Sequence, residues 1–285
     1  MGNVAAMKGT VRIAYLHHST GEAIWQGGAR GRLFRMWERA TPGWASSWVN
    51  KIYPSSVPGI IANWNAANGT DYRIAHLTYP ATKDGYPWEN YPYDYWNLWV
   101  AHAGDQHDRG EMNLDDLVRN YDVIVFKHCF PVSGIMPQSG EPDVKLSDKT
   151  IGNYMLQYEA LKRRLHQFPT KRFVIWTGPV LAQSATDAAQ ARRARQFFDW
   201  VRTTWDEKGD NIYLWDFYSI AADANGYLAA RHESAPGNSH PGADLSRGAA
   251  GLVGRRIVDV IEGRGDSGAL TGRVRDPNES GDALR

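Results

Sequence analysis

Short apolar segments that alternate with helical patterns are the feature that most constrains the fold of this chain. Four runs, at 11–16, 121–127, 172–178 and 211–217, are rich in β-branched or aromatic residues, and a weaker run lies at 72–77. Their nearly continuous apolar character is typical of strands that are covered on both faces, as in a parallel sheet. We therefore predict a mainly parallel sheet of five strands.

Helical patterns occur between and after these predicted strands. We expect helices at residues 27–40, 150–168, 185–209 and 242–263, the third with Asp187 near its start. Strands that alternate with helices form right-handed βαβ units, in which the helices cover the sheet. The sequence thus predicts an α/β protein, built as a three-layer α/β/α sandwich.

One domain accounts for most of the chain. We expect it to span residues 1–262, with an aromatic-rich insertion at about 78–111 and a second long connection at 128–147. Long connections after the strands of an α/β sheet tend to be functional, because ligands bind outside the carboxyl ends of the strands. Residues 263–285 are rich in Gly, Asp and Arg without an apolar period, so we expect a disordered tail there.

The composition excludes several classes of protein. The formal net charge is +1, so we expect no nucleic-acid or membrane partner. The single cysteine, Cys129, rules out an intrachain disulfide framework and a multi-cysteine zinc site, and we expect it to be a small buried apolar residue. No signal-peptide pattern opens the chain, which favours a cytoplasmic protein, or a secreted or periplasmic one if a leader was removed. The oligomeric state stays open.

Metal binding has one candidate cluster in the sequence. His102 and His107 could bind a metal together with Asp105 or Asp108. A cluster of this kind on a polar loop is more typical of a solvated surface. We therefore predict no metal and no cofactor.

Polar side chains follow the first predicted strand in the segment "LHHSTG". Ser19 comes at the carboxyl edge of the sheet, and a serine hydroxyl needs a base before it acts as a nucleophile. The best candidate is His240, in "GNSHPG" before the last predicted helix, although a polar loop that only caps the next helix is an alternative. We expect His17 to hold the loop through backbone hydrogen bonds, whereas His18 fits a site-lining role and a structural role equally.

Six segments occur in the order "YLHHSTG", "VIVFKHCFPVSGI", "FVIWTGPVL", "ARRARQFFDWV", "NIYLWDFY" and "GNSHPG". They resemble the blocks of SGNH/GDSL-type hydrolases, and more narrowly a poorly characterised branch whose first block reads like HHSTG. The resemblance covers residues 11–261. It implies a flavodoxin-like fold of the SGNH type and hydrolysis without a cofactor.

The resemblance also assigns roles to residues. Ser19 would be the nucleophile, with its backbone N–H helping to hold the oxyanion, and His240 would be the base. The third block of the superfamily usually supplies a glycine and an asparagine near the oxyanion, but the matching run here, residues 127–130, has no asparagine. We expect Lys127 or His128 to act there as a cationic donor.

The last block departs from the superfamily as well. The usual aspartate, three residues before the histidine, is replaced by Gly237, and Asn238 stands where the branch has a carboxylate. An asparagine can orient an imidazole, but it cannot stabilise an imidazolium by charge. Asp216, at the end of the last predicted strand, either substitutes for the carboxylate or caps the following turn.

The chain has 12 Trp and 14 Tyr, and many of these aromatic residues lie in the insertion. They are interleaved with Pro, Asp, Asn and Gly, which suits a wet surface that grips a flat, partly apolar ligand. We expect a cleft beside Ser19 and a carbohydrate substrate, because Trp and Tyr rings pack against the C–H faces of sugars. The rings expected to line that cleft are Tyr86, Trp88, Tyr91, Tyr93, Tyr95 and Trp96.

These observations together predict a serine hydrolase that removes O-acyl groups, such as acetyl, from a carbohydrate. One alternative is a non-catalytic carbohydrate-binding protein on the same fold, favoured by the altered third and last blocks. The other is a glycan-cleaving enzyme, in which two facing carboxylates of the insertion divide the acid and nucleophile roles. The carboxylates available for it are Asp84, Glu89, Asp94 and Asp105.

Overall fold

Five parallel strands form the centre of the protein. The computed structural model describes residues 5–28, 53–81 and 88–273. The strands are β1 (Thr10–His17), β2 (Asp71–Thr78), β3 (Val123–Phe126), β4 (Arg172–Trp176) and β5 (Ile212–Trp215), and their order in the sheet is β2-β1-β3-β4-β5. Every neighbouring pair is parallel. The predicted strands and the parallel sheet are therefore confirmed.

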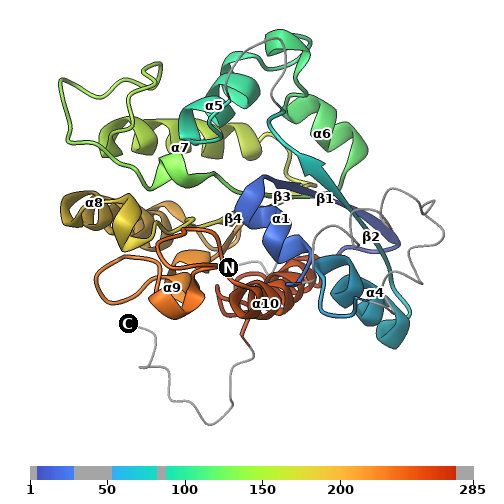
Figure 1. Ribbon diagram of the computed structural model, residues 1–285. Helices are drawn as coiled ribbons and strands as arrows, with labels where there is room; N and C mark the ends of the chain where they lie inside the picture. The colour runs from blue at the N-terminus through green and yellow to red at the C-terminus, as the bar shows by residue number, and fades with distance from the viewer. Residues whose placement is uncertain (1–4, 29–52, 82–87, 274–285) are drawn as a thin grey trace.

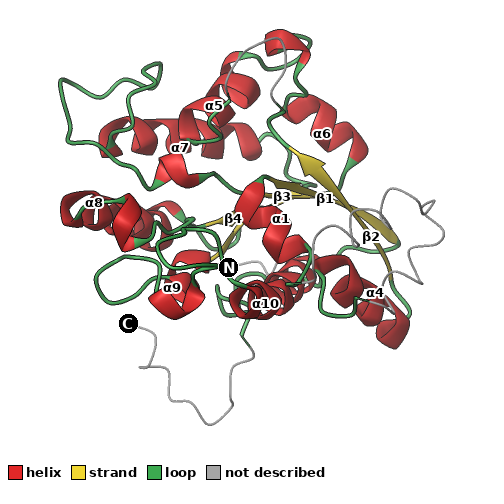
Figure 2. Cartoon of the chain, viewed as in Figure 1, coloured by secondary structure: helices red, strands yellow, loops and turns green. Residues whose placement is uncertain are grey.

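Helices cover both faces of this sheet, so the three-layer α/β/α sandwich is confirmed (Figure 2). Figure 1 shows one group on one side of the strands: α5 (Pro92–Trp96), α6 (Leu114–Asn120) and α7 (Ile151–Leu165). The other side carries α4 (Val57–Asn68), α9 (Phe217–Ala221) and α10 (Ala243–Ile261). α8 (Ala188–Trp200) packs beside α7, and α1 (Ser19–Trp25) packs against α10 and α4.

The predicted helices correspond to elements with slightly different ends. The helices predicted at 150–168 and 242–263 correspond to α7 and α10. Asp187 is the N-cap of α8, where its side chain accepts hydrogen bonds from two backbone N–H groups, as its position predicts. The predicted helix at 27–40 lies almost wholly outside the described residues. Short helical turns occur at Asn97–Ala101, Asp108–Gly110, Phe130–Val132, Gln183–Ala185, Val201–Trp205 and Ala230–His232.

The register of β1 and β2 decides which side chains meet at one end of the sheet. Tyr15 lies opposite His76, and His17 lies opposite Thr78. Because side chains alternate along a strand, His76 and His17 are diagonal neighbours on the same face of the sheet. Two histidines that are 59 positions apart are thus brought together.

The segment after α10 is part of the folded structure as far as residue 273. The backbone N–H of Asp216 donates to the carbonyl of Leu270 at 2.9 Å, and Nε1 of Trp215 donates to the carbonyl of Thr271 at 3.0 Å. Leu270 also packs against the core. The predicted tail is therefore wrong for residues 263–273, because they cover the end of β5, while 274–285 lie outside the described residues.

Among the described helices, none combines the length and the apolar character needed to cross a lipid bilayer.

Candidate active site

Ser19 is the first residue of α1 and follows the carboxyl end of β1 by one residue. It is exposed, and its φ of 21° lies in a region that non-glycine residues rarely adopt. Backbone outliers of this kind cost roughly 1–3 kcal/mol and cluster at functional sites. Within the described residues, the backbone N–H of Ser19 makes no hydrogen bond to another backbone group.

Gly21 lets the first turn of α1 lie directly on its neighbours. A Cβ at this position would come within 2.5 Å of the Cβ of His17 and 3.0 Å of the Cε of Lys127. Any side chain would therefore push α1 away from the ends of β1 and β3. Gly21 thus sets how closely the first turn of α1 approaches Lys127.

Lys127 directly follows β3 and is almost completely buried. Its ammonium donates to the carbonyl of His128 at 2.9 Å and lies 3.4 Å from the Sγ of Cys129. An ammonium has three donors, so one remains for another acceptor. Burial lowers the pKa of Lys127, and burial together with the charge of Lys127 lowers the pKa values of His18 and His240. The charge of Lys127 therefore acts on a histidine of the Ser19 loop and on His240 itself.

Asn238 fixes the tautomer of His240. Oδ1 of Asn238 accepts from the backbone N–H of His240 at 2.9 Å, and it also lies 3.0 Å from Nδ1 of that ring. A backbone N–H can only donate, so the Asn238 atom is the oxygen, and Nδ1 of His240 must carry the proton. Nε2 is then unprotonated in the neutral ring, which is the form that a general base requires. Partial burial and the charge of Lys127 lower the pKa of His240.

The described structure holds no hydrogen bond between Ser19 and His240. Both nevertheless border the segment that follows β3. His240 packs edge-on against the ring of Phe130, with centroids 5.1 Å apart, and Lys127 lies under the turn that carries Ser19. Their pairing through a direct contact or one water stays a prediction.

Asp216 is engaged away from His240. It is the N-cap of α9, and its carboxylate accepts from Thr177 Oγ1 at 2.7 Å and from Ser219 Oγ at 2.6 Å. Arg202 lies 3.5 Å from the second oxygen. These contacts match the capping alternative for Asp216, and no hydrogen bond within the described residues joins it to His240.

The two histidines beside the predicted site have different surroundings. Nε2 of His18 donates to the carbonyl of Pro80 at 2.6 Å, so the backbone holds this half-buried ring. His128 is buried among the rings of Tyr95, Phe126 and Tyr158, and neither of its nitrogens has a hydrogen-bond partner. Burial lowers the pKa of His128 to about 3. The prediction of a cationic donor at His128 is therefore wrong, because the ring is neutral and faces the core.

The aromatic insertion is mostly core rather than cleft. Trp88, Tyr91 and Tyr95 are buried, and the hydroxyl of Tyr95 donates to the carbonyl of Lys127 at 3.1 Å. The expectation that these three rings line a cleft is wrong, because all three belong to the hydrophobic core, where Tyr95 stacks on Phe126 of β3 and Tyr91 contacts Tyr154 of α7. Tyr93 and Trp96 are only partly buried, with ring centroids 5.6 Å apart, whereas Tyr86 lies outside the described residues.

Two pockets lie elsewhere on the described part of the molecule. Trp96 lines one of about 720 Å³, together with residues of the 141–146 loop and of α7. Another, of about 670 Å³, lies between α4, α10 and the C-terminal segment. Neither is lined by Ser19 or His240.

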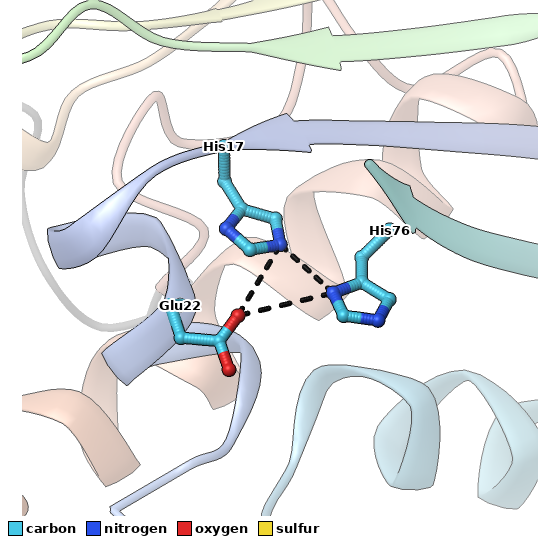
Figure 3. Close-up of side chains that lie close together, drawn as sticks. All are labelled: His17, Glu22 and His76. Carbon is cyan, nitrogen blue, oxygen red and sulfur yellow. Dashed lines mark hydrogen bonds and ion pairs between the residues drawn. The ribbon is translucent and has the colours of Figure 1, made fainter. Parts of the chain in front are cut away.

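His102 and His107, which the sequence offered as metal ligands, each contact a different residue. Nδ1 of His102 bonds the carbonyl of Asn97 at 2.9 Å, and Nε2 of His107 bonds Asp116 at 2.7 Å. In the described part of the chain, a different trio brings metal-ligating atoms within 4.8 Å of one another: His17, Glu22 and His76 (Figure 3). No sequence pattern points to Glu22 and His76, because their proximity to His17 depends on the register of β1 and β2 and on the path of α1.

Comparisons with known proteins show no family for this chain. No protein-family model matches the sequence, and no curated protein matches it. Among solved structures, a gut microbial diltiazem-metabolizing enzyme aligns at 10% identity with a TM-score of 0.44, over 91% of this chain and 48% of that one. A carbohydrate esterase family 2 enzyme with a carbohydrate-binding domain, from Corynascus thermopiles (Myceliophthora fergusii), aligns at 13% identity with a TM-score of 0.43, over 92% and 69%.

This chain thus spans about half the length of the first structure. Likeness at this level carries no conclusion about substrate or mechanism.

Proposed function

We propose that the protein is a serine ester hydrolase in which Ser19 is the nucleophile and His240 the base. The observation that carries the proposal is the orientation of His240, whose Nδ1 is held by Asn238 so that Nε2 is free to take a proton. The exposed hydroxyl of Ser19 follows the end of β1, where active sites of parallel α/β sheets form. Its backbone N–H, which makes no backbone hydrogen bond within the described residues, suits a developing oxyanion.

In the proposed reaction, Ser19 Oγ attacks the ester carbonyl while Nε2 of His240 removes the hydroxyl proton. The imidazolium then gives that proton to the leaving alcohol, and an acyl-serine remains. Water, deprotonated by the same imidazole, releases the carboxylic acid and restores Ser19. Asn238 keeps the ring in place but adds no negative charge, so we expect turnover to be slower than with an aspartate at this position.

The substrate class that we propose is an O-acylated sugar, with acetyl as the acyl group. This part rests on the resemblance to SGNH/GDSL-type hydrolases, since the rings of Trp88, Tyr91 and Tyr95 are in the core.

The surroundings of the carboxylates in the insertion give less support to the glycan-cleaving alternative than to the serine hydrolase. Asp94 is buried, which raises its pKa to about 7, and it accepts the backbone N–H of Asn90 at 2.7 Å as part of the start of α5. Glu89 forms an ion pair with Lys149 at 2.7 Å. Asp105 is exposed, and Asp84 lies outside the described residues. The described carboxylates thus have structural or solvent partners.

Hydrolysis rates of 4-nitrophenyl acetate and of acetylated xylo-oligosaccharides test the proposal. Ser19→Ala should lower kcat/KM for both by at least about a thousandfold, while Ser139→Ala, an exposed serine on another loop, should leave it unchanged. Activity on the nitrophenyl ester alone would support the proposed mechanism and refute the proposed sugar substrate. Sugar binding without hydrolysis of either ester would instead establish the non-catalytic alternative, which the missing carboxylate at Asn238 favours.

A further inference from the structure

Three side chains with metal-ligating atoms converge beside the first turn of α1 (Figure 3). His17 comes from the carboxyl end of β1, His76 from β2, and Glu22 from α1. No residue of the trio has a part in the proposed hydrolysis. We propose that His17, Glu22 and His76 bind a divalent transition-metal ion of the zinc type, with solvent as the fourth ligand.

The distances between the three ligating atoms fit one ion. Nε2 of His17 lies 2.9 Å from Nδ1 of His76, and Oε2 of Glu22 lies 3.5 Å and 3.8 Å from these two nitrogens. A point equidistant from the three atoms is about 2.0 Å from each, which is the length of a zinc–nitrogen or zinc–oxygen bond. The trio is therefore compact enough for a single small cation.

The second oxygen of the carboxylate is already occupied. Nε2 of Gln26 donates to Oε1 of Glu22, so the oxygen that remains, Oε2, is the one that faces the two imidazoles. Hydrogen bonds to a ligand's other atom orient that ligand toward a metal. Trp25 adds a steric restraint, because its ring lies 4.9 Å from that of His76 at an interplanar angle of 9°.

The donor types select the class of ion. Two imidazole nitrogens and one carboxylate oxygen suit Zn²⁺ and its first-row neighbours, whereas Mg²⁺ and Ca²⁺ prefer oxygen ligands alone. His17 is 2% exposed, while His76 and Glu22 are 30% and 25% exposed, so water can reach the outer side of the trio. That access provides the fourth ligand.

The two imidazoles also have a metal-free arrangement. Their rings are nearly parallel, with nitrogens facing at 2.9 Å, so without an ion one ring donates a proton to the other. A bound ion replaces this shared proton and requires both rings to turn slightly. Binding would then tie α1, which begins at Ser19, to both β1 and β2.

Titration of tag-free, chelator-treated protein with Zn²⁺ and with Co²⁺ tests the proposal. We expect one equivalent to bind, with the visible absorption of four-coordinate Co²⁺ and a rise in Tm. His76→Gln and Glu22→Gln should each weaken binding by about a hundredfold or more, and Gln26→Leu by about tenfold. His166→Gln is the matched control, since His166 is a partly exposed histidine paired with Asp210 at 2.9 Å, and it should bind as the wild type does.

Ser19→Ala should also bind the ion normally, which separates this proposal from the hydrolase proposal. Circular dichroism of each variant shows that the fold is kept, and Glu22→Gln preserves the size of the side chain. Absence of stoichiometric binding by the wild type would mean that the trio holds only a proton, and it would overturn the proposal. Binding that survives both His76→Gln and Glu22→Gln would overturn it equally.

Discussion

A carboxylate in place of Asn238 should raise both the pKa of His240 and the rate of hydrolysis. Asn238→Asp keeps the size of the side chain and an oxygen that can accept from the backbone N–H and from Nδ1 of His240, now 2.9 and 3.0 Å away. It adds one negative charge beside the imidazolium that forms when Ser19 loses its proton. The loop is polar and exposed, so we expect the fold to tolerate the charge.

The magnitude follows from the separation of the charges. Two unit charges about 4 Å apart attract by about 1 kcal/mol in water and by about 4 kcal/mol at an effective dielectric constant of 20. His240 is exposed, so the lower value applies. About 1 kcal/mol corresponds to a pKa higher by about 0.7 and to a rate about fivefold higher.

The assay combines kcat/KM at pH 8, where the imidazole is neutral in both proteins, with an NMR titration of His240. Asp216→Asn is the comparison, because Asp216 accepts from Thr177 and caps α9. It should cost about 1 kcal/mol of unfolding free energy without changing the rate per folded molecule. A large loss of rate in Asp216→Asn, with no gain in Asn238→Asp, would give the orienting role to Asp216. If neither variant changes the rate, a histidine base oriented from this loop is refuted.

Three further predictions concern the surroundings of the site. Gly21→Ala would place a Cβ 3.0 Å from Lys127, so we expect the free energy of unfolding in urea to fall by about 1–3 kcal/mol and kcat/KM to fall at least tenfold. The control is Gly248→Ala, in open space on α10, which should stabilise the fold by up to about 1 kcal/mol. The acid limb of kcat/KM should lie below pH 6.5, because the pKa of His240 is lowered, and Lys127→Met should move it upward; an unmoved limb contradicts the electrostatic link. The pKa of His128 falls to about 3 in the folded protein, so below pH 6.5 the unfolded protein binds more protons at this residue than the folded protein does. The free energy of unfolding should therefore fall by up to about 1.4 kcal/mol per pH unit toward pH 3. His128→Phe should remove that slope in denaturant titrations, and an unchanged slope would refute this prediction.

The strands could be predicted from the sequence because a strand buried on both faces leaves a continuous apolar run. The insertion could not be interpreted in the same way. Trp88, Tyr91 and Tyr95 are buried, but the Pro, Asp and Asn residues between them suggested a loop. Those neighbours start the helix: Pro92 stands in the first turn of α5, and Asp94 accepts a backbone N–H at its beginning.

Contacts within the site divide by their distance along the chain. The contact between Asn238 and His240 joins positions only two apart, but the sequence left open whether Asn238 or Asp216 orients the ring. The convergence of His17, Glu22 and His76 depends on the register of two strands and on the path of α1, which no local pattern specifies. The neutral state of His128 likewise follows from rings on other elements that enclose it.

Labelling with a fluorophosphonate, followed by peptide mass spectrometry, tests the central claim most directly. The reagent forms a stable bond only with a serine whose proton can be removed by a base in reach. We predict stoichiometric modification of Ser19, lost in Ser19→Ala, strongly slowed in His240→Ala, and unchanged in Ser139→Ala. A folded protein that stays unlabelled at Ser19, or that is labelled at another residue instead, would contradict the assignment of Ser19 as the nucleophile.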